Sequence, residues 1–92
     1  MSDDLVRLQT TPRVAPMFRL QWEEVQQSWV LLYPEGMVKL NGSAGEIMQR
    51  IDGKKTIAAL IAELETAFDA TGLQADVLAF LDIAIAQGWV KP

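Results

Sequence analysis

The sequence of 92 residues contains neither cysteine nor histidine. Without thiolates or imidazoles, it cannot form a zinc or iron–sulfur site of the usual ligand set. It also offers no cysteine or histidine nucleophile and no proton shuttle that titrates near neutral pH. An enzyme built on this chain would depend on carboxylates, hydroxyls or lysine alone. The two absences therefore remove most kinds of site chemistry.

Positive charge is also scarce. Eight Lys and Arg stand against twelve Asp and Glu, which gives a net charge of −4. Binding to nucleic acid needs clustered basic residues that displace counterions from phosphates, so the composition argues against a nucleic-acid partner. The start, Met1-Ser2-Asp3-Asp4, lacks the basic and then apolar order of a signal peptide, and no apolar run is long enough to cross a bilayer. We expect a cytoplasmic protein with no membrane partner.

What is present is typical of one folded domain. Hydrophobic residues make up 50% of the chain and charged residues 22%, which are globular values. Residues 1–17 have no sustained hydrophobic period, and Pro12 and Pro16 interrupt regular structure. The sequence therefore predicts a flexible or loosely docked arm over residues 1–17, followed by a single domain over residues 18–92.

Three segments after this arm have the pattern of strands. Apolar and polar residues alternate over 18–23, and β-branched and aromatic residues dominate 29–33. A turn at Pro34-Glu35-Gly36 separates the second segment from a third, over 37–40. The sequence predicts an antiparallel meander whose second and third strands form a tight hairpin.

Helical spacing begins after Asn41-Gly42. The spacing of Ser43 and Glu46 predicts a capping box at the start of the first helix. Thr56 is the expected N-cap of a second helix, and a third is expected from about Gln74 to Gln87, ending at Gly88. The order of elements predicts an α+β fold, winged-helix-turn-helix-like, with a three-stranded antiparallel sheet followed by three helices.

The third predicted helix has an unusually wide apolar face and no Lys or Arg. Its apolar side chains cover about 160° of the circumference, more than one core contact requires, so we expect a second cover on one flank. A helix that reads DNA bases would carry several Arg, Lys, Asn or Gln residues, so this helix is not expected to bind DNA. The apolar residues are Val77, Leu78, Phe80, Leu81, Ala84 and Ile85.

Several segments together resemble one known family. The string RLQWEEVQQSWVLLYPEGMVKLN over 19–41 is the most distinctive, above all Leu31 to Glu35 followed by Leu40-Asn41. Later matches are Ala44 and Ile47, Asp52-Gly53, Asp76-Val77, Phe80-Leu81 and the terminal Gly88-Trp89-Val90. With these residues, the chain resembles the PqqD family of pyrroloquinoline quinone biosynthesis over nearly its whole length beyond the arm.

The resemblance implies a winged-helix-like module that is not an enzyme and has no cofactor of its own. Such a module holds a ribosomally made precursor peptide and delivers it to a radical S-adenosylmethionine enzyme. The peptide is expected to add as a strand to the third strand and to lie beside the third helix. Carried over to this sequence, the binding residues are Met37, Val38, Lys39, Leu40 and Asn41 on the strand and Val77, Leu78, Leu81 and Ile85 on the helix.

Other interpretations stay open at this stage. Leu78 and Ile85 would be buried equally well in a homodimer, which would make the chain a structural dimer module or a non-basic winged-helix interaction domain. Trp22, Trp29 and Trp89 are expected to serve mainly in packing. Asp76 most simply complements the dipole of the third helix. A carboxylate enzyme would need two acids that converge in a pocket, whereas the acids here are scattered along the sequence.

Overall fold

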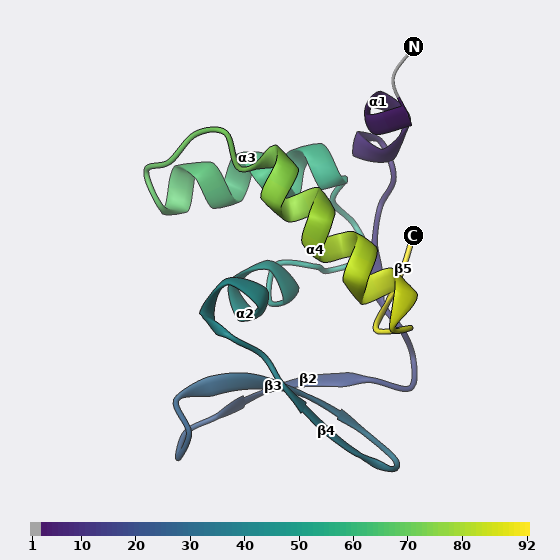
Figure 1. Ribbon diagram of the computed structural model, residues 1–92, viewed down its shortest axis with the longest axis vertical. Coiled ribbons are helices and arrows are strands. Elements are labelled where there is room, and N and C mark those ends of the chain that lie inside the picture. Colours follow the sequence, from purple (N-terminus) through teal and green to yellow (C-terminus); the bar gives the residue numbers. More distant parts are fainter. Residues whose placement is uncertain (1–2) are drawn as a thin grey trace.

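A computed structural model describes residues 3–92 of the chain, which form two layers. A three-stranded sheet lies at one end, a short helix lies directly over it, and two longer helices lie beyond that helix (Figure 1). The predicted α+β class is confirmed, with an extra helix and a two-stranded ribbon beyond the expected elements. In chain order the elements are α1 (Asp3–Leu8), β1 (Arg13–Val14), β2 (Arg19–Glu23), β3 (Ser28–Tyr33), β4 (Gly36–Lys39), α2 (Gly42–Met48), α3 (Ile57–Ala67), α4 (Gln74–Ala86) and β5 (Val90–Lys91).

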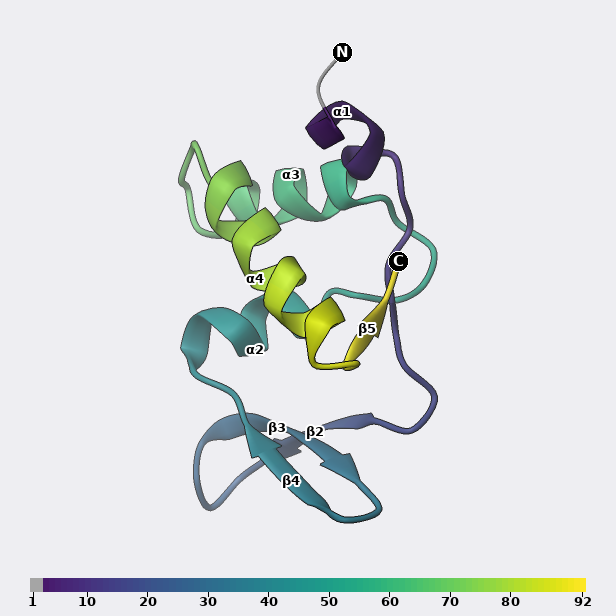
Figure 2. The same cartoon turned by 45° about the vertical axis from the view of Figure 1, so that its right-hand side comes forward.

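The sheet has the order β2-β3-β4, with both pairs antiparallel, as the meander prediction requires. Leu31 at its centre lies opposite Leu20 of β2 and Val38 of β4, so these three side chains share one face. Leu31 is fully buried in the core, and α2 lies over this face (Figure 2). The alternating pattern of the sequence therefore places its apolar side toward the helices.

One hydrophobic core joins the sheet to α2, α3 and α4. Helix α3 turns Leu60 inward and α4 turns Leu81 inward, and both side chains are fully buried, as is Met48 of α2. Because every element contributes its apolar side to the same cluster, the sheet and the helices are held in one fixed arrangement. The buried members are Leu31, Leu40, Ala44, Ile47, Met48, Ile51, Ile57, Leu60, Ile61, Leu64, Val77, Leu78, Leu81, Ala84 and Val90.

Gly45 allows α2 to lie directly on the sheet. A Cβ atom at this position would be 2.8 Å from Cδ1 of Trp29 and 3.2 Å from its Cβ. We expect Gly45→Ala to lower the free energy of unfolding by about 1–3 kcal/mol, because the indole or the helix must move. Urea unfolding measures this change. Gly42→Ala on the same helix is the matched control, since no atom lies within 4 Å of its added Cβ, and it is expected to be neutral or slightly stabilising.

The start of α2 differs from the prediction. The expected capping box of Ser43 and Glu46 is wrong, because the N-cap is Asn41, whose Oδ1 accepts the backbone N–H of Ala44 at 2.8 Å. Asn41 has extended backbone angles, so the N-cap lies two residues before Ser43 and the helix begins at Gly42. Glu46 instead accepts from Arg50, one helical turn on, at 2.7 Å.

The two later helices begin and end close to the predicted residues. Thr56 is the N-cap of α3, and its side chain accepts from the backbone N–H of Ala59. Helix α4 ends at Ala86, just before Gly88, whose φ of 80° lies in the left-handed region that glycine adopts freely. In the loop before α3, Asp52 accepts the backbone N–H groups of Lys54 and Lys55, and these hydrogen bonds lower the pKa of its carboxyl.

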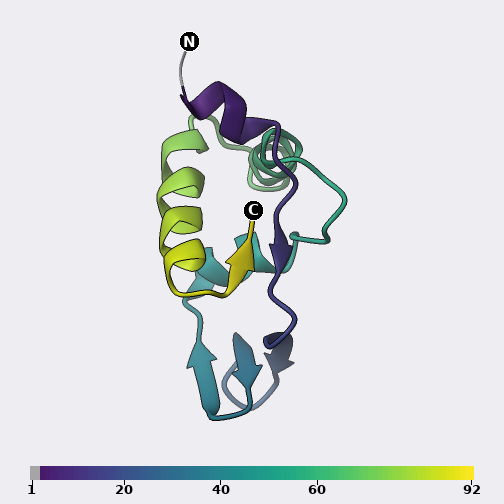
Figure 3. The same cartoon turned by 90° about the vertical axis from the view of Figure 1, so that its right-hand side faces the viewer.

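The described part of the predicted arm, residues 3–17, contains a helix and a strand that the sequence pattern did not reveal. Arg7 of α1 pairs with Asp82 of α4 at 2.7 Å, and Thr10 accepts the backbone N–H of Ile57 at 3.0 Å. Strand β1 then pairs with β5 at the other end of the chain (purple and yellow arrows in Figure 3). Met1 and Ser2 lie outside the described residues, and the division into a flexible arm and a domain stays a prediction.

Candidate functional site

Strand β4 is at the edge of the sheet, with β3 as its neighbour on one side and no second strand partner among residues 3–92. The N–H of Leu40 donates to the carbonyl of Trp29 on β3 at 3.0 Å. Because antiparallel strands turn alternate residues toward the neighbour, Val38 also faces β3, whereas Met37 and Lys39 direct their N–H and C=O groups outward. Strand β4 has four residues, and two of them, Met37 and Lys39, are open to backbone pairing with another chain.

Helix α4 lies on the same side of the molecule as β4. In Figure 3 both elements stand at the left, with the helix above the strand and with α2 behind. A chain that paired with β4 would therefore run beneath α4. This arrangement agrees with the predicted combination of an edge strand and a helical wall.

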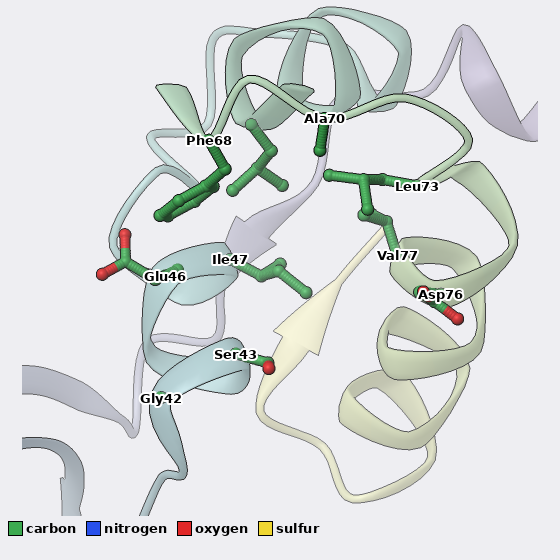
Figure 4. Close-up of a pocket in the computed structure, with 10 residues that line it drawn as sticks. Gly42, Ser43, Glu46, Ile47, Phe68, Ala70, Leu73, Asp76 and Val77 are labelled. Atoms are coloured by element: carbon green, nitrogen blue, oxygen red, sulfur yellow. The ribbon is translucent and has the colours of Figure 1, made fainter. Parts of the chain in front are cut away.

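An apolar pocket of about 390 Å³ begins where β4 ends. Gly42 and Ser43, which follow the strand closely in the sequence, form one part of its wall, and the first turn of α4 forms the opposite part (Figure 4). Its volume is in the range of natural ligand sites. The pocket thus lies between α2 and α4, and its nearest lining residue to β4 along the chain is Gly42, three residues after Lys39. The lining residues are Gly42, Ser43, Glu46, Ile47, Leu64, Phe68, Ala70, Leu73, Asp76 and Val77.

The two sides of α4 have different surroundings. Asp76 and Val77 line the pocket, and Phe80 and Ile83 follow Asp76 at the spacing that continues the same side of a helix. Ile83 keeps 55% of its surface exposed and leaves an apolar strip beside the pocket. The other side carries Asp82, which pairs with Arg7 of α1.

The strand residues of the predicted site are placed as an edge strand requires. Met37 and Lys39 are exposed, Val38 is half-buried and Leu40 is buried in the core. Asn41 is exposed, but its side chain and carbonyl already hold the first turn of α2. Met37 and Lys39 are therefore the predicted residues with both a free backbone edge and an accessible side chain.

The helix residues of the predicted site do not form one accessible wall. Val77, Leu78 and Leu81 are at most 6% exposed, and of these only Val77 lines the pocket. Arg7 of α1 donates to the carbonyl of Leu78, so the N-terminal segment supplies the second cover that the wide apolar face required. Ile85 is 36% exposed and, by helical spacing, lies toward this covered side.

Sequence reasoning missed most of the pocket. Phe68 and Leu73 line it from the loop between α3 and α4, and Ile47 from α2. Helical spacing offered one usable signal, since Asp76 and Ile83 lie seven residues apart on one side of the helix, outside its buried face. The loop residues carried no such signal, because their position depends on how α3 and α4 pack.

Phe68 is held at the pocket by a charged neighbour. It is 51% exposed, and the guanidinium of Arg50 lies 5.5 Å from the centre of its ring. Arg50 in turn forms an ion pair with Glu46 at 2.7 Å. Arg50 therefore contacts both the Phe68 ring and the Glu46 carboxylate at the pocket. Asp76, the other carboxylate that lines the pocket, makes no ion pair within residues 3–92.

A second, smaller pocket of about 180 Å³ lies on the other side of Gly42 and Glu46. Trp22 and Trp29 line it in an edge-to-face arrangement, with their ring centres 5.5 Å apart. The hydroxyl oxygen of Ser28 is buried there without a hydrogen-bond partner in the described chain. The tryptophans thus combine packing with a partly open surface.

Over residues 3–92, no group of three or more carboxylates is arranged to hold a metal ion. Within the same span, every helix is too short or too polar to cross a bilayer.

The sheet, the three helices that follow it and the edge strand beside α4 define a winged-helix-like α+β module. Residues 28–90 match the family described as Coenzyme PQQ synthesis protein D (PqqD). The chain belongs to the PqqD family, which confirms the resemblance seen in the sequence.

Proteins similar to this chain support the assignment. The PqqA binding protein of Pseudomonas aeruginosa (strain UCBPP-PA14) is 48% identical over 88 residues, which cover 95% of this chain and 96% of the relative. The PqqA binding protein of Acinetobacter baylyi is 49% identical over 84 residues, covering 90% and 85%.

A solved structure has the same fold. The solution structure of the PqqD truncation of Methylobacterium extorquens PqqCD matches with a TM-score of 0.74 and 25% identity, covering 94% of this chain and 97% of that one. That protein is described as a functional and stand-alone recognition element for ribosomally synthesized and post-translationally modified peptides.

Proposed function

We propose that this chain is a chaperone for the precursor peptide of pyrroloquinoline quinone, and that it binds the peptide as an added strand on β4. The observation that carries the proposal is the open edge at Met37 and Lys39, together with the pocket that begins at Gly42, three residues further along the chain. Backbone pairing supplies affinity that depends little on the side chains of the peptide, and the pocket and α4 supply selectivity. Relatives named PqqA binding protein support the same partner.

The chain then presents the peptide to a radical S-adenosylmethionine enzyme of the same pathway and takes no part in the chemistry. A peptide paired with β4 leaves its own outer edge unpaired, so a partner can still reach it. Membership of a peptide-binding family supports a non-catalytic role, and a chain without thiolates or imidazoles suits it. The proposed setting is the cytoplasm, where such a peptide is made.

Calorimetry with a synthetic PqqA-type precursor peptide tests the proposal. We expect one peptide per chain with a dissociation constant in the micromolar to sub-micromolar range. Much tighter binding is not expected, because ordering a flexible peptide offsets part of the interaction energy. Amide shifts in labelled protein should concentrate on Met37 to Asn41, on Ser43 and on the first half of α4. The control is the isolated half of the peptide that carries the modified residues. A full-length peptide that gives neither heat nor shifts contradicts the proposal.

A structural homodimer is the second candidate. The exposed apolar side chains of Ile83 and Ile85 favour it, since a second copy would cover them. Sedimentation at several protein concentrations, with and without the peptide, separates the two functions. A dimer whose mass and stability do not change when the peptide is added supports the structural role.

A further inference from the structure

The open edge of β4 is too short to fix where a peptide pairs with it. Two outward-facing residues offer few backbone hydrogen bonds, and neighbouring registers of the peptide would satisfy them equally well. A one-residue slip would turn every peptide side chain to the opposite face. Side chains near the edge must therefore select the register.

The pocket end of this edge is acidic. Glu46 and Asp76 line the pocket, and both carboxylates are drawn at its rim in Figure 4. Arg50 offsets the charge of Glu46, whereas Asp76 is exposed and forms no ion pair with any described residue. Glu65 of α3, whose carboxylate accepts the backbone N–H of the pocket residue Leu73 at 3.0 Å, adds negative charge nearby. A cation at the pocket mouth would thus meet an attractive field.

The strand itself carries the opposite charge. Lys39 is exposed, and its cross-strand partner is Val30, so its ammonium has no acid directly opposite it on β3. Within the described chain Lys39 makes no ion pair. A strand added to β4 would place one of its own side chains next to Lys39, on the sheet face that points away from the helices.

We infer that the bound peptide carries a basic residue facing Asp76 and an acidic residue beside Lys39, and that this charge pair sets the register of strand addition. The inference rests on the proposed function. Val38 faces the helices, so Lys39 lies on the other face of the sheet, whereas Asp76 belongs to a helix. The two peptide charges must therefore lie on opposite faces of the added strand, which requires them to be an odd number of positions apart.

Asp76 also has a structural role that the test must separate. It lies in the first turn of α4, whose N-cap residue Leu73 makes no side-chain capping bond, so its carboxylate stabilises the helix dipole. That role changes thermal stability whether or not a peptide is present. A salt-dependent change in peptide affinity, cancelled by a matching change in the peptide, belongs only to the proposed contact.

The experiment is a double-mutant cycle between protein and precursor peptide, followed by calorimetry at low salt. The protein variants are Asp76→Asn and Lys39→Gln. Their controls are Asp69→Asn, which lies outside the pocket at a positive φ that Asn tolerates, and Lys54→Gln, which is exposed and distant from β4. In the peptide, each charged residue is neutralised in turn.

We expect Asp76→Asn and Lys39→Gln each to weaken binding about two- to fivefold, with less effect at high salt, and the controls to leave it unchanged. Neutralising one basic peptide residue should remove the effect of Asp76→Asn, and one acidic residue that of Lys39→Gln. Equal affinities for Asp76→Asn and Asp69→Asn overturn the inference while leaving peptide binding intact. Failure of the unmodified chain to bind the precursor overturns the proposed function itself.

Discussion

Replacing Lys39 by proline is expected to abolish capture of the precursor peptide while the protein still folds. The N–H of Lys39 points away from β3, so its loss breaks no bond inside the sheet. The proline ring removes one donor from the open edge and occupies the space into which an incoming strand must pair. We expect the dissociation constant to rise by at least about tenfold, with a melting temperature close to that of the parent. Calorimetry and circular dichroism measure the two quantities.

Two further variants, one at Lys39 and one at Val38, show whether the loss of affinity comes from the outward-facing backbone donor. Lys39→Gln removes the charge but keeps the backbone donor, so it should lose far less affinity than Lys39→Pro. Val38→Pro removes a donor that faces β3, so it should destabilise the sheet as well as the site. If Lys39→Pro binds the peptide as well as Lys39→Gln does, the peptide does not pair with β4.

Replacing Leu81 by glutamate is expected to unfold the protein. Leu81 is 0% exposed at the centre of the core, where a carboxylate would have neither water nor a cation. A loss of several kcal/mol is a large part of the stability of a domain of this size. Thermal unfolding should show no cooperative transition at neutral pH.

Ile83→Glu tests the same helix without damaging the core. Ile83 is more than half exposed on the pocket side, so the variant should fold normally and bind the precursor peptide more weakly. Ile85→Glu is the matched control, because Ile85 is also exposed in part but lies toward the side that α1 covers. If Ile85→Glu lowers the affinity for the peptide more than Ile83→Glu does, the peptide contacts the side of α4 that was predicted from the sequence.

Local patterns were sufficient for most of the fold. Alternation over 18–23 and 37–40, and β-branched and aromatic residues over 29–33, predicted the three strands. Thr56 and Gly88 marked helix boundaries because capping and left-handed backbone depend on adjacent residues. The capping box failed because two neighbouring residues, Asn41 and Ser43, both have N-cap chemistry, and the extended backbone at Asn41 decided between them.

Segments stabilised by distant partners were harder to predict. Arg13 and Val14 form a strand only because Lys91 and Val90 lie beside them, about 77 residues along the chain. Helix α1 is short and has little stability alone, and its position depends on contacts such as Arg7 with Asp82. Hydrophobic periodicity cannot detect such pairs, since neither segment is regular by itself.

The sequence by itself determined what this protein lacks, the order of its strands and helices and, through its resemblance, its family. The absence of cysteine and histidine, the turn at Pro34-Glu35-Gly36 and the stripes of the helices are all local properties. Only the tertiary structure decided which side of α4 is free, because helical spacing shows that a face is apolar but not which neighbour covers it. Here α1 contacts the helix beside Leu78, while Val77 is left to the pocket. The pocket exists because Gly42, Phe68 and Asp76, from three separate segments, meet at the end of one edge strand.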